Sequence, residues 1–365
     1  MITIQKKLDL PDTYPLDRIG PVSDILFFDI ETTGFSGDYS NLYLIGCTYY
    51  QDDCWNLIQW FADTKAAESE LLDCFFSFLG NYKILIHFNG DGFDIPYLLK
   101  RCKHLKKNYD FSGVESVDIY KKIKPYKKLL GLESMKQKAI EQFLKVTRTD
   151  QFSGGELIDV YHRYLKTQDP SLYDLLLLHN EDDLKGMPTI LPILNYPDFL
   201  EHSLTLESQN IMKELYSDGT ISHSLELVCK SSFSVPVSFS SARKPVFCQV
   251  CSDTMTLTVQ LYEGTLRHFY PNYKDYYYFP QEDQAVHKSF VSSSDKNKYT
   301  KAAAKNCYTR ETGIFLPQFE QIWEPALKEE LKDKSSYVSL SDVCLKNPDC
   351  FNSYLKQLLT YLGVK

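Results

Sequence analysis

The sequence predicts an α/β fold over residues 1–204, followed by a second, strand-rich region over residues 205–365. In the first region, strand-like runs come first and then alternate with helical segments, which is typical of an α/β layer. Beyond residue 204 this alternation gives way to strand patterns rich in Tyr and Ser. A chain of 365 residues is long enough for two domains, and we place the boundary at this change.

The first region is expected to begin its sheet with three adjacent antiparallel strands, over 24–34, 42–50 and 54–63. Helical spacing then covers 65–80, and a short apolar run over 83–90 predicts a buried strand. A helix follows with Asp94 at its N-cap, and a further strand ends at Asp118. Later helices are expected over 133–144, 156–166 and 170–194, the last kinked at Pro188 and Pro192.

The second region is expected to be α+β. It begins with a predicted helix just after residue 204, continues with strands over 232–240 and 253–270, and ends in helices near 318–331 and 350–362. Seven aromatic residues lie in the segment 268–280, which has the composition of a base-stacking surface. Alternating tyrosines on a half-buried strand explain it equally well, so a nucleic-acid clamp and an interaction module both remain open.

The composition excludes several classes of protein. No apolar run approaches the roughly 18 residues that a membrane span requires. The start, MITIQKKLDLPD, lacks the pattern of a secretory signal, so we expect a cytoplasmic protein whose ten cysteines are reduced thiols. Cys248 and Cys251 have the spacing of half a zinc site, but no second pair follows and a structural zinc site needs four ligands.

Charge is unevenly distributed along the chain. The net charge is −8, yet residues 100–148 hold 14 Lys and Arg against 5 Asp and Glu. Residues 288–310 hold six Lys and Arg against one Asp. Such segregation indicates a surface that meets phosphates, although a solvated helix face is the alternative for each segment.

Acidic residues stand where strands and helices are expected to end. Asp29 and Glu31 are two apart on a strand and therefore project to the same face. Two anions held this close call for a cation, and Mg²⁺ prefers such oxygen ligands, although an exposed acidic turn is the alternative. His179 and Asp183 are four apart and share a helix face, whereas Asp182 points about 100° away.

The ordered set FDIETTG, FNGDGFD and HNEDD resembles the three exonuclease motifs of the DEDD superfamily of ribonuclease-H-like nucleases. Within it, the chain most resembles the YprB-type bacterial exonuclease family, with kinship to the proofreading domains of family-B DNA polymerases. LYLIGCTYY, SVDIYKKIK and GGELIDVYHRYL are also similar, so that the resemblance spans residues 22–195. It implies a mixed five-stranded sheet flanked by helices, with the C-terminal α+β region as an accessory domain.

The resemblance implies a function and a set of site residues. Asp29, Glu31, Asp94 and Asp183 would bind two Mg²⁺ or Mn²⁺ ions for two-metal hydrolysis of phosphodiester bonds, removing nucleotides 3′ to 5′ from single-stranded DNA or RNA. His179 departs from the superfamily pattern, because it fills the register that tyrosine usually holds. We assign it to orienting or deprotonating the attacking water, with a structural role as the alternative.

Four more residues are expected to bind the terminal nucleotide: Thr32, Thr33, Asn89 and Phe93. The basic segment 100–148 would follow the backbone, and Asp118 is either an acid behind the site or an ordinary strand-end residue. Two alternatives to the exonuclease are a catalytically inactive nucleic-acid-binding or scaffolding protein and an unrelated hydrolase of small phosphoesters.

Overall fold

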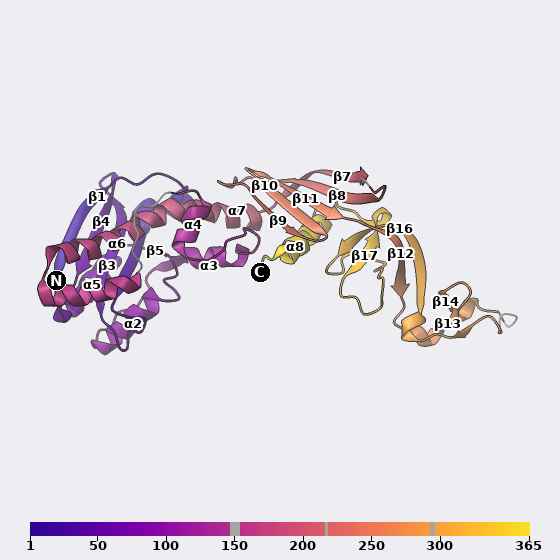
Figure 1. Cartoon of the computed structure of the whole chain (residues 1–365), viewed down its shortest axis with the longest axis horizontal. Coiled ribbons are helices and arrows are strands. Elements are labelled where there is room, and N and C mark those ends of the chain that lie inside the picture. Colours follow the sequence, from indigo (N-terminus) through magenta and orange to yellow (C-terminus); the bar gives the residue numbers. More distant parts are fainter. Residues whose placement is uncertain (147–153, 216–217, 293–295) are drawn as a thin grey trace. The chain divides into compact units, whose positions relative to one another are not determined.

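The computed structural model describes residues 1–146, 154–215, 218–292 and 296–365 (Figure 1). The chain forms two compact units. Unit 1 comprises Met1–Lys127 and Leu132–Asp198, and unit 2 comprises Lys128–Gly131 and Phe199–Lys365. The assignment of residues 1–204 and 205–365 to two functional domains stays a prediction.

Unit 1 is built on a six-stranded mixed sheet with the order β1-β4-β3-β2-β5-β6. Its strands are β1 (Ile2–Leu8), β2 (Ile25–Thr32), β3 (Leu42–Gln51), β4 (Cys54–Phe61), β5 (Ile84–His87) and β6 (Glu115–Asp118). The three antiparallel strands predicted at the start are β2, β3 and β4, and β5 and β6 add to β2 in parallel. The predicted fold class is confirmed, with β1 as one strand more than expected.

Strand β1 was not apparent from the sequence because apolar and polar residues alternate only over 2–5 and the polar Lys6 and Lys7 follow. It pairs antiparallel with β4 along its whole length, and its residues alternate poorly between apolar and polar. Lys6 of β1 donates to the buried Glu181, which also pairs with Lys185. These bonds lower the Glu181 pKa although burial alone would raise it. An ion pair therefore joins the edge strand to the helix behind it.

Helices cover both faces of this sheet. The helices of this part of the chain are α1 (Glu68–Leu79), α2 (Asp94–His104), α3 (Ile119–Ile123), α4 (Gln137–Phe143), α5 (Gly154–Thr167), α6 (Pro170–Ile190) and α7 (Asn195–Glu201), the last of which begins in unit 1 and ends in unit 2. The predicted helices over 65–80, 133–144, 156–166 and 170–194 are confirmed, and Pro188 lies in the last turn of α6, before a 3-10 turn.

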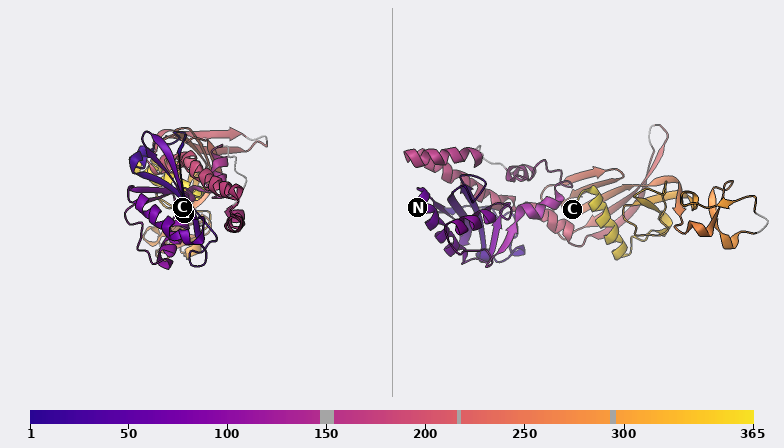
Figure 2. Two further views of the ribbon diagram at one scale, coloured as in Figure 1. Left: turned by 90° about the vertical axis from the view of Figure 1, so that its left-hand side faces the viewer. Right: turned by 90° about the horizontal axis from the view of Figure 1, so that it is seen from below.

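The two faces of β2 meet different helices. Phe28 stacks on Phe75 of α1 with ring centroids 5.6 Å apart, and both side chains are fully buried in the apolar core. The opposite face of the sheet meets α6, which packs on β2 and β3 and lies beside α5 (Figure 2). Since side chains alternate along a strand, Asp29 and Glu31 face the side on which α6 lies.

The described residues of unit 2 form three sheets and one long helix. The first sheet has the order β7-β8-β11-β10-β9, the second β12-β16-β17 and the third β14-β13-β15. The strands are β7 (Thr205–Leu215), β8 (Ile221–Lys230), β9 (Phe239–Arg243), β10 (Val246–Cys251), β11 (Thr254–Gln260), β12 (Tyr262–Phe269), β13 (Tyr276–Phe279), β14 (Gln284–His287), β15 (Thr300–Lys301), β16 (Tyr308–Gln318) and β17 (Ser336–Ser339). Helix α8 (Pro348–Leu362) confirms the helix predicted at 350–362.

Two expectations for unit 2 are wrong. The segment predicted as a helix after residue 204 is strand β7, because ten of its residues pair with β8 and this pairing overrides the helix-forming composition. The helix predicted near 318–331 is absent from the described structure: its start, Gln318, ends β16, and the rest is irregular, with isolated β-bridges at Leu327 and Lys328. Pro325 within it removes a backbone donor that a helix would need.

Other expectations concern single features of the chain. Strands β11 and β12 confirm the strand prediction for 253–270, whereas only the end of the run 232–240 is a strand. Cys248 is buried and Cys251 is exposed on β10, so the two thiols point to opposite faces of their sheet. Among the helices of the described residues, none has the length and apolar character needed to span a membrane.

Candidate active site

The first motif places two carboxylates at the end of a central strand. Asp29 and Glu31 lie on β2 opposite Gly46 and Leu44 of β3. The register of this pair shifts between Glu31 and Thr32, and such a bulge re-aims side chains at the end of a strand. Glu31 is buried, and its Oε2 accepts a long hydrogen bond of 3.4 Å from the Tyr43 hydroxyl. The strand therefore holds both acids on one face.

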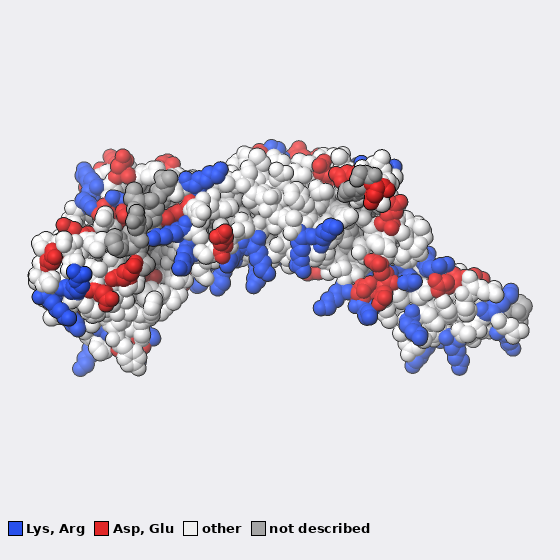
Figure 3. All heavy atoms as spheres, in the orientation of Figure 1, with Lys and Arg blue, Asp and Glu red and all other residues white. Residues whose placement is uncertain are grey.

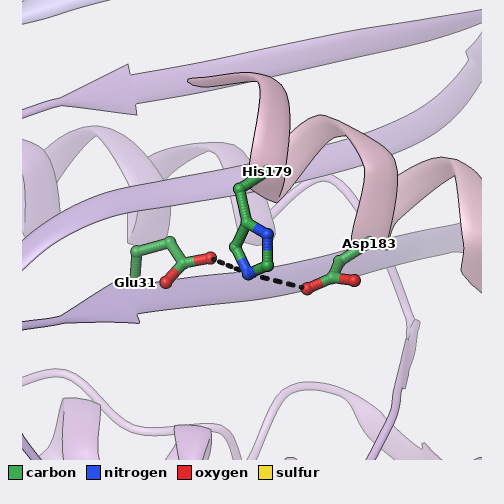
Figure 4. A group of neighbouring side chains, drawn as sticks. All are labelled: Glu31, His179 and Asp183. Carbon is green, nitrogen blue, oxygen red and sulfur yellow. Dashed lines mark ion pairs between the residues drawn. The ribbon is translucent and has the colours of Figure 1, made fainter. Parts of the chain in front are cut away.

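Helix α6 brings His179 and Asp183 to the same place. The imidazole Nε2 of His179 lies 3.7 Å from Glu31 Oε1 and 3.6 Å from Asp183 Oδ2, between the two carboxylates (Figure 4). One ligand atom from each of these three residues lies within 4.8 Å of the others. The spacing of four residues that the sequence suggested does place the imidazole and the carboxylate on one helix face.

Asp94 comes from the second motif, at the start of α2. The helix begins at Asp94, and Phe93 rather than Asp94 occupies the N-cap, which corrects the expected cap. The Asp94 side chain is only 6% exposed. Its carboxylate accepts backbone hydrogen bonds from its own N–H and from that of Ile30, which lies between Asp29 and Glu31. The second motif is thereby hydrogen-bonded to the first.

The four carboxylates are close enough to influence one another's ionisation. Burial raises the pKa of Asp29 well above its ordinary value, and the charges of Asp94, Glu31 and Asp183 raise it further. Burial likewise raises the pKa of Asp94 to about 7. When these acids are ionised, their negative charges repel one another. A bound cation offsets this repulsion. The donor set, four carboxylates and an imidazole, is one that divalent metal ions accept.

Three residues that the sequence analysis did not single out hold Asp29 in place. Asn180 is fully buried, and its Nδ2 donates to Asp29 Oδ2 over 2.9 Å. Its Oδ1 accepts from Gln59 Nε2, also over 2.9 Å, and Gln59 donates to the Leu177 carbonyl as well. At Gly46, a Cβ would lie 2.0 Å from Asn180 Oδ1. The available signal was the glycine itself, because a glycine inside an apolar strand marks a close approach.

The loop between β5 and α2 is shaped by Asp118 and His87. Asn89 has a φ of 62°, and its N–H donates to Asp118 Oδ1 over 2.9 Å. Asp118 also accepts from the Asp91 and Lys121 N–H groups, so this strand-end carboxylate fixes the loop and caps α3. His87 accepts from the Gly90 N–H and contacts Ser116 through Nε2. Both ring nitrogens of His87 are thus engaged in shaping the loop.

The residues predicted to bind the terminal nucleotide lie at the end of β2 and in the loop before α2. Phe93 is partly buried, and its ring lies 6.3 Å from that of Phe35, which is 90% exposed. Thr32 Oγ1 donates to the Gly34 carbonyl, and Thr33 Oγ1 accepts from the Asn41 N–H. The two threonines therefore shape the turn after β2, and their binding role, like that of Asn89 and Phe93, stays a prediction.

Part of the basic segment 100–148 serves the fold. Arg101 is only 3% exposed, and its Nε and Nη2 donate to the two carboxylate oxygens of Glu68 over 2.6 and 2.7 Å. Lys107 pairs with Asp73, and Lys121 with Asp91. These cations already have acidic partners, so the net charge of the segment overstates what it offers to a phosphate backbone.

Comparison with known proteins supports the fold. Residues 26–195 match the family model of the RNase H superfamily. No curated protein matches the sequence. Among solved structures, a family B DNA polymerase from the archaeon Pyrobaculum calidifontis is similar at 13% identity and a TM-score of 0.38, over 69% of this chain and 35% of the polymerase. E. coli exonuclease I in complex with a dT13 oligonucleotide is similar at 11% identity and a TM-score of 0.26, over 56% of this chain and 54% of that one.

The family model and the sheet carry the assignment, because structural scores this low show no more than a partial likeness. The chain spans about a third of the length of the polymerase and about half that of exonuclease I. The matched segment contains the four acidic residues and His179, which lie on β2, α2 and α6. Residues 26–195 of this chain thus have the ribonuclease-H-like fold.

Proposed function

We propose that the chain is a metal-dependent exonuclease that removes nucleotides from the 3′ end of single-stranded DNA or RNA. The observation that carries the proposal is the group of Glu31, His179 and Asp183, whose ligand atoms lie within 4.8 Å of one another. The buried Asp29 supports it, because the charges of Asp94, Glu31 and Asp183 add to burial in raising its pKa. The order of the three motifs further supports a place for unit 1 among the YprB-type exonucleases.

Asp29, Glu31, Asp94 and Asp183 would hold two Mg²⁺ or Mn²⁺ ions. When bound, such ions lower the pKa of a water molecule and stabilise the leaving oxygen of the phosphodiester. The protein supplies ionised oxygen ligands in fixed positions. Asn180 orients Asp29 through its hydrogen bond, and the Ile30 N–H orients Asp94, so that little rearrangement accompanies binding.

His179 orients or deprotonates the attacking water in this proposal. Its Nε2 is within 4 Å of oxygens of both Glu31 and Asp183 and therefore faces the site where substrate would react. An imidazole exchanges protons near neutral pH, which suits a general base. Asn89 and Phe93, at the adjoining loop, would position the terminal nucleotide.

The test is digestion of a 20-nucleotide single strand labelled at its 5′ end, with Mg²⁺ or Mn²⁺, as DNA and as RNA. Stepwise shortening of the labelled strand is expected for a 3′-to-5′ exonuclease. Asp29→Asn and Asp183→Asn should each abolish shortening, whereas Asp174→Asn, an exposed acid on the same helix α6, should leave it unchanged.

Three outcomes would contradict the proposal. Shortening that survives both Asp29→Asn and Asp183→Asn rules out this site. Binding of the strand without cleavage, with either metal, identifies a nucleic-acid-binding protein that has lost turnover. Release of phosphate from mononucleotides without chain shortening identifies a hydrolase of small phosphoesters.

A further inference from the structure

The small sheet β14-β13-β15 of unit 2 has two unlike faces. Tyr276 and Tyr278 point to one face and Tyr277 and Phe279 to the other, because side chains alternate along β13. On the first face the tyrosines serve the fold. Tyr276 stacks on Tyr270 with centroids 4.7 Å apart, and the Tyr278 and Tyr308 hydroxyls both donate to Asp283.

The second face, formed by Tyr277, Tyr299, Lys288 and Lys301, is here called the tyrosine–lysine face. Tyr277 and Tyr299 stack with centroids 4.1 Å apart and an interplanar angle of 28°, and both rings are partly exposed. Lys301 is the direct partner of Tyr277 across the β13–β15 pair. The Lys288 ammonium lies 5.5 Å from the centre of the Tyr277 ring. Two cations thus flank a pair of stacked rings.

The surroundings of this face are strongly basic. The described residues 284–292 and 296–310 contain six Lys and Arg and no Asp or Glu, and of these six Arg310 pairs with Asp283, just before this stretch. The side chains of Lys288, Lys296, Lys301 and Lys305 are all exposed. Figure 3 shows Lys and Arg side chains gathered around β13 and β14, although the protein as a whole carries a net charge of −8. Phe290, just after β14, is 83% exposed.

Stacked aromatic rings flanked by lysines fit one class of ligand. Phosphates of a nucleic acid backbone bind lysine ammonium groups, and unpaired bases stack on aromatic rings whatever their identity. A duplex would satisfy the lysines but would not present its bases to the rings. An acidic peptide would likewise leave the stacked tyrosines without a planar partner.

We propose that the tyrosine–lysine face of unit 2 is a binding surface for single-stranded nucleic acid, separate from the acidic site of unit 1. The inference rests on the proposed function for the identity of the ligand, since the same kind of strand is the proposed substrate. It gives residues 205–365 a role in holding the strand. The acidic site on its own does not favour binding, because its carboxylates repel the phosphates of the strand.

The test uses the full chain carrying Asp29→Asn, in EDTA, so that binding is measured without cleavage. Fluorescence anisotropy with labelled dT20 and rU20 gives the Kd at several salt concentrations. Each phosphate contact on a single strand contributes a salt slope of about 0.7, or about fivefold in Kd at 0.1 M salt. Lys288→Ala with Lys301→Ala should therefore raise the Kd about 25-fold at 0.1 M salt and lower the slope by about 1.4.

Tyr277→Ala should raise the Kd at least about fivefold with little change in the salt slope, because stacking is not an ionic contact. The matched control is Lys332→Ala with Lys356→Ala, two exposed lysines of unit 2 outside the face, which should leave the Kd unchanged. Circular dichroism of each variant checks that unit 2 remains folded, and Tyr277→Phe, which keeps the ring, should bind as the parent does.

The outcomes separate this inference from the proposed function. Unchanged binding in both the lysine and the Tyr277→Ala variants would contradict the proposed surface. A loss of affinity equal to that of the control variant would also contradict it. Cleavage by the wild-type chain with unchanged binding in these variants contradicts only the proposed binding surface. Binding that depends on the tyrosine–lysine face, without cleavage by the wild-type chain, contradicts only the proposed exonuclease function. Loss with dT20 alone or rU20 alone supports the surface and identifies the strand it takes.

Discussion

Replacing Asp94 by Asn tests whether the buried carboxylates destabilise the folded protein when no cation is bound. The pKa of Asp94 rises from 3.8 to about 7, first through burial. A carboxyl group with a raised pKa keeps its proton longer in the folded state than in the unfolded state. The metal-free protein therefore loses stability as the pH rises from about 4 to about 7, and the loss is complete above that range.

The size of this loss follows from the pKa difference. Each pKa unit is worth about 1.4 kcal/mol, so a rise of about 3 units corresponds to about 4 kcal/mol in the free energy of unfolding of metal-free protein at pH 8. Asparagine has nearly the same shape, does not ionise, and keeps an oxygen that accepts from the Ile30 N–H. Asp94→Asn should therefore be more stable than the parent at pH 8 in EDTA, by up to about 4 kcal/mol, and equal to it near pH 4.

The assay is equilibrium urea denaturation at pH 4.5 and pH 8, followed by tryptophan fluorescence. A Trp323→Phe background leaves Trp55 and Trp60, both in unit 1, as reporters. Adding Mg²⁺ at pH 8 should stabilise the parent and do little for Asp94→Asn, which should also lose cleavage. A variant that is less stable than the parent in EDTA at pH 8 would refute the reasoning.

Asp91 provides the matched control for this experiment. Burial raises its pKa, but hydrogen bonds from Lys121 and Ser116 outweigh burial and lower it. A lowered pKa contributes stability above about pH 4, which is lost as the pH falls. Asp91→Asn should therefore destabilise the protein at pH 8, opposite in sign to Asp94→Asn, and Mg²⁺ should still stabilise it.

Three further predictions concern neighbouring residues. Gly46→Ala should destabilise unit 1 by about 1–3 kcal/mol and reduce cleavage at least tenfold, because the new Cβ displaces Asn180 from Asp29; normal urea melting and activity would contradict this. His179→Gln should lower kcat by about 10²–10⁴ while Mn²⁺ affinity, measured by calorimetry, changes little; equal activity would leave the imidazole a packing role. Arg101→Ala should cost about 3–5 kcal/mol in the free energy of unfolding, because it leaves the buried Glu68 unpaired; a loss of strand affinity without a loss of stability would show that Arg101 binds phosphate instead.

Much of unit 1 was predictable because its elements are strongly patterned. Strands β2, β3 and β4 are apolar runs bounded by turn residues, and α1 and α6 keep helical spacing over several turns. Spacing alone also placed Asp29 beside Glu31 and His179 beside Asp183. That all of them meet Asp94 depends on β5 lying next to β2, and this came from the resemblance, not from periodicity.

What the sequence did not reveal depends on tertiary contacts. Asn180 stands next to His179 in the chain but points to the sheet, where Gly46 leaves room for it. Strand β7 has a helix-forming composition and becomes a strand only because β8 offers it a partner. Arg101 counted towards a basic surface in the sequence, yet the fold buries it against Glu68. Apart from Gly46, whose place inside an apolar strand marks a close approach, these contacts have no local signature.

The proposed nuclease function requires that divalent ions bind among the four acids. Anomalous diffraction from crystals soaked in Mn²⁺ tests this directly. We expect two peaks, with Asp29, Glu31, Asp94 and Asp183 supplying the protein oxygens, and both peaks should be lost in Asp29→Asn. Crystals with manganese elsewhere and none among these four side chains would contradict it.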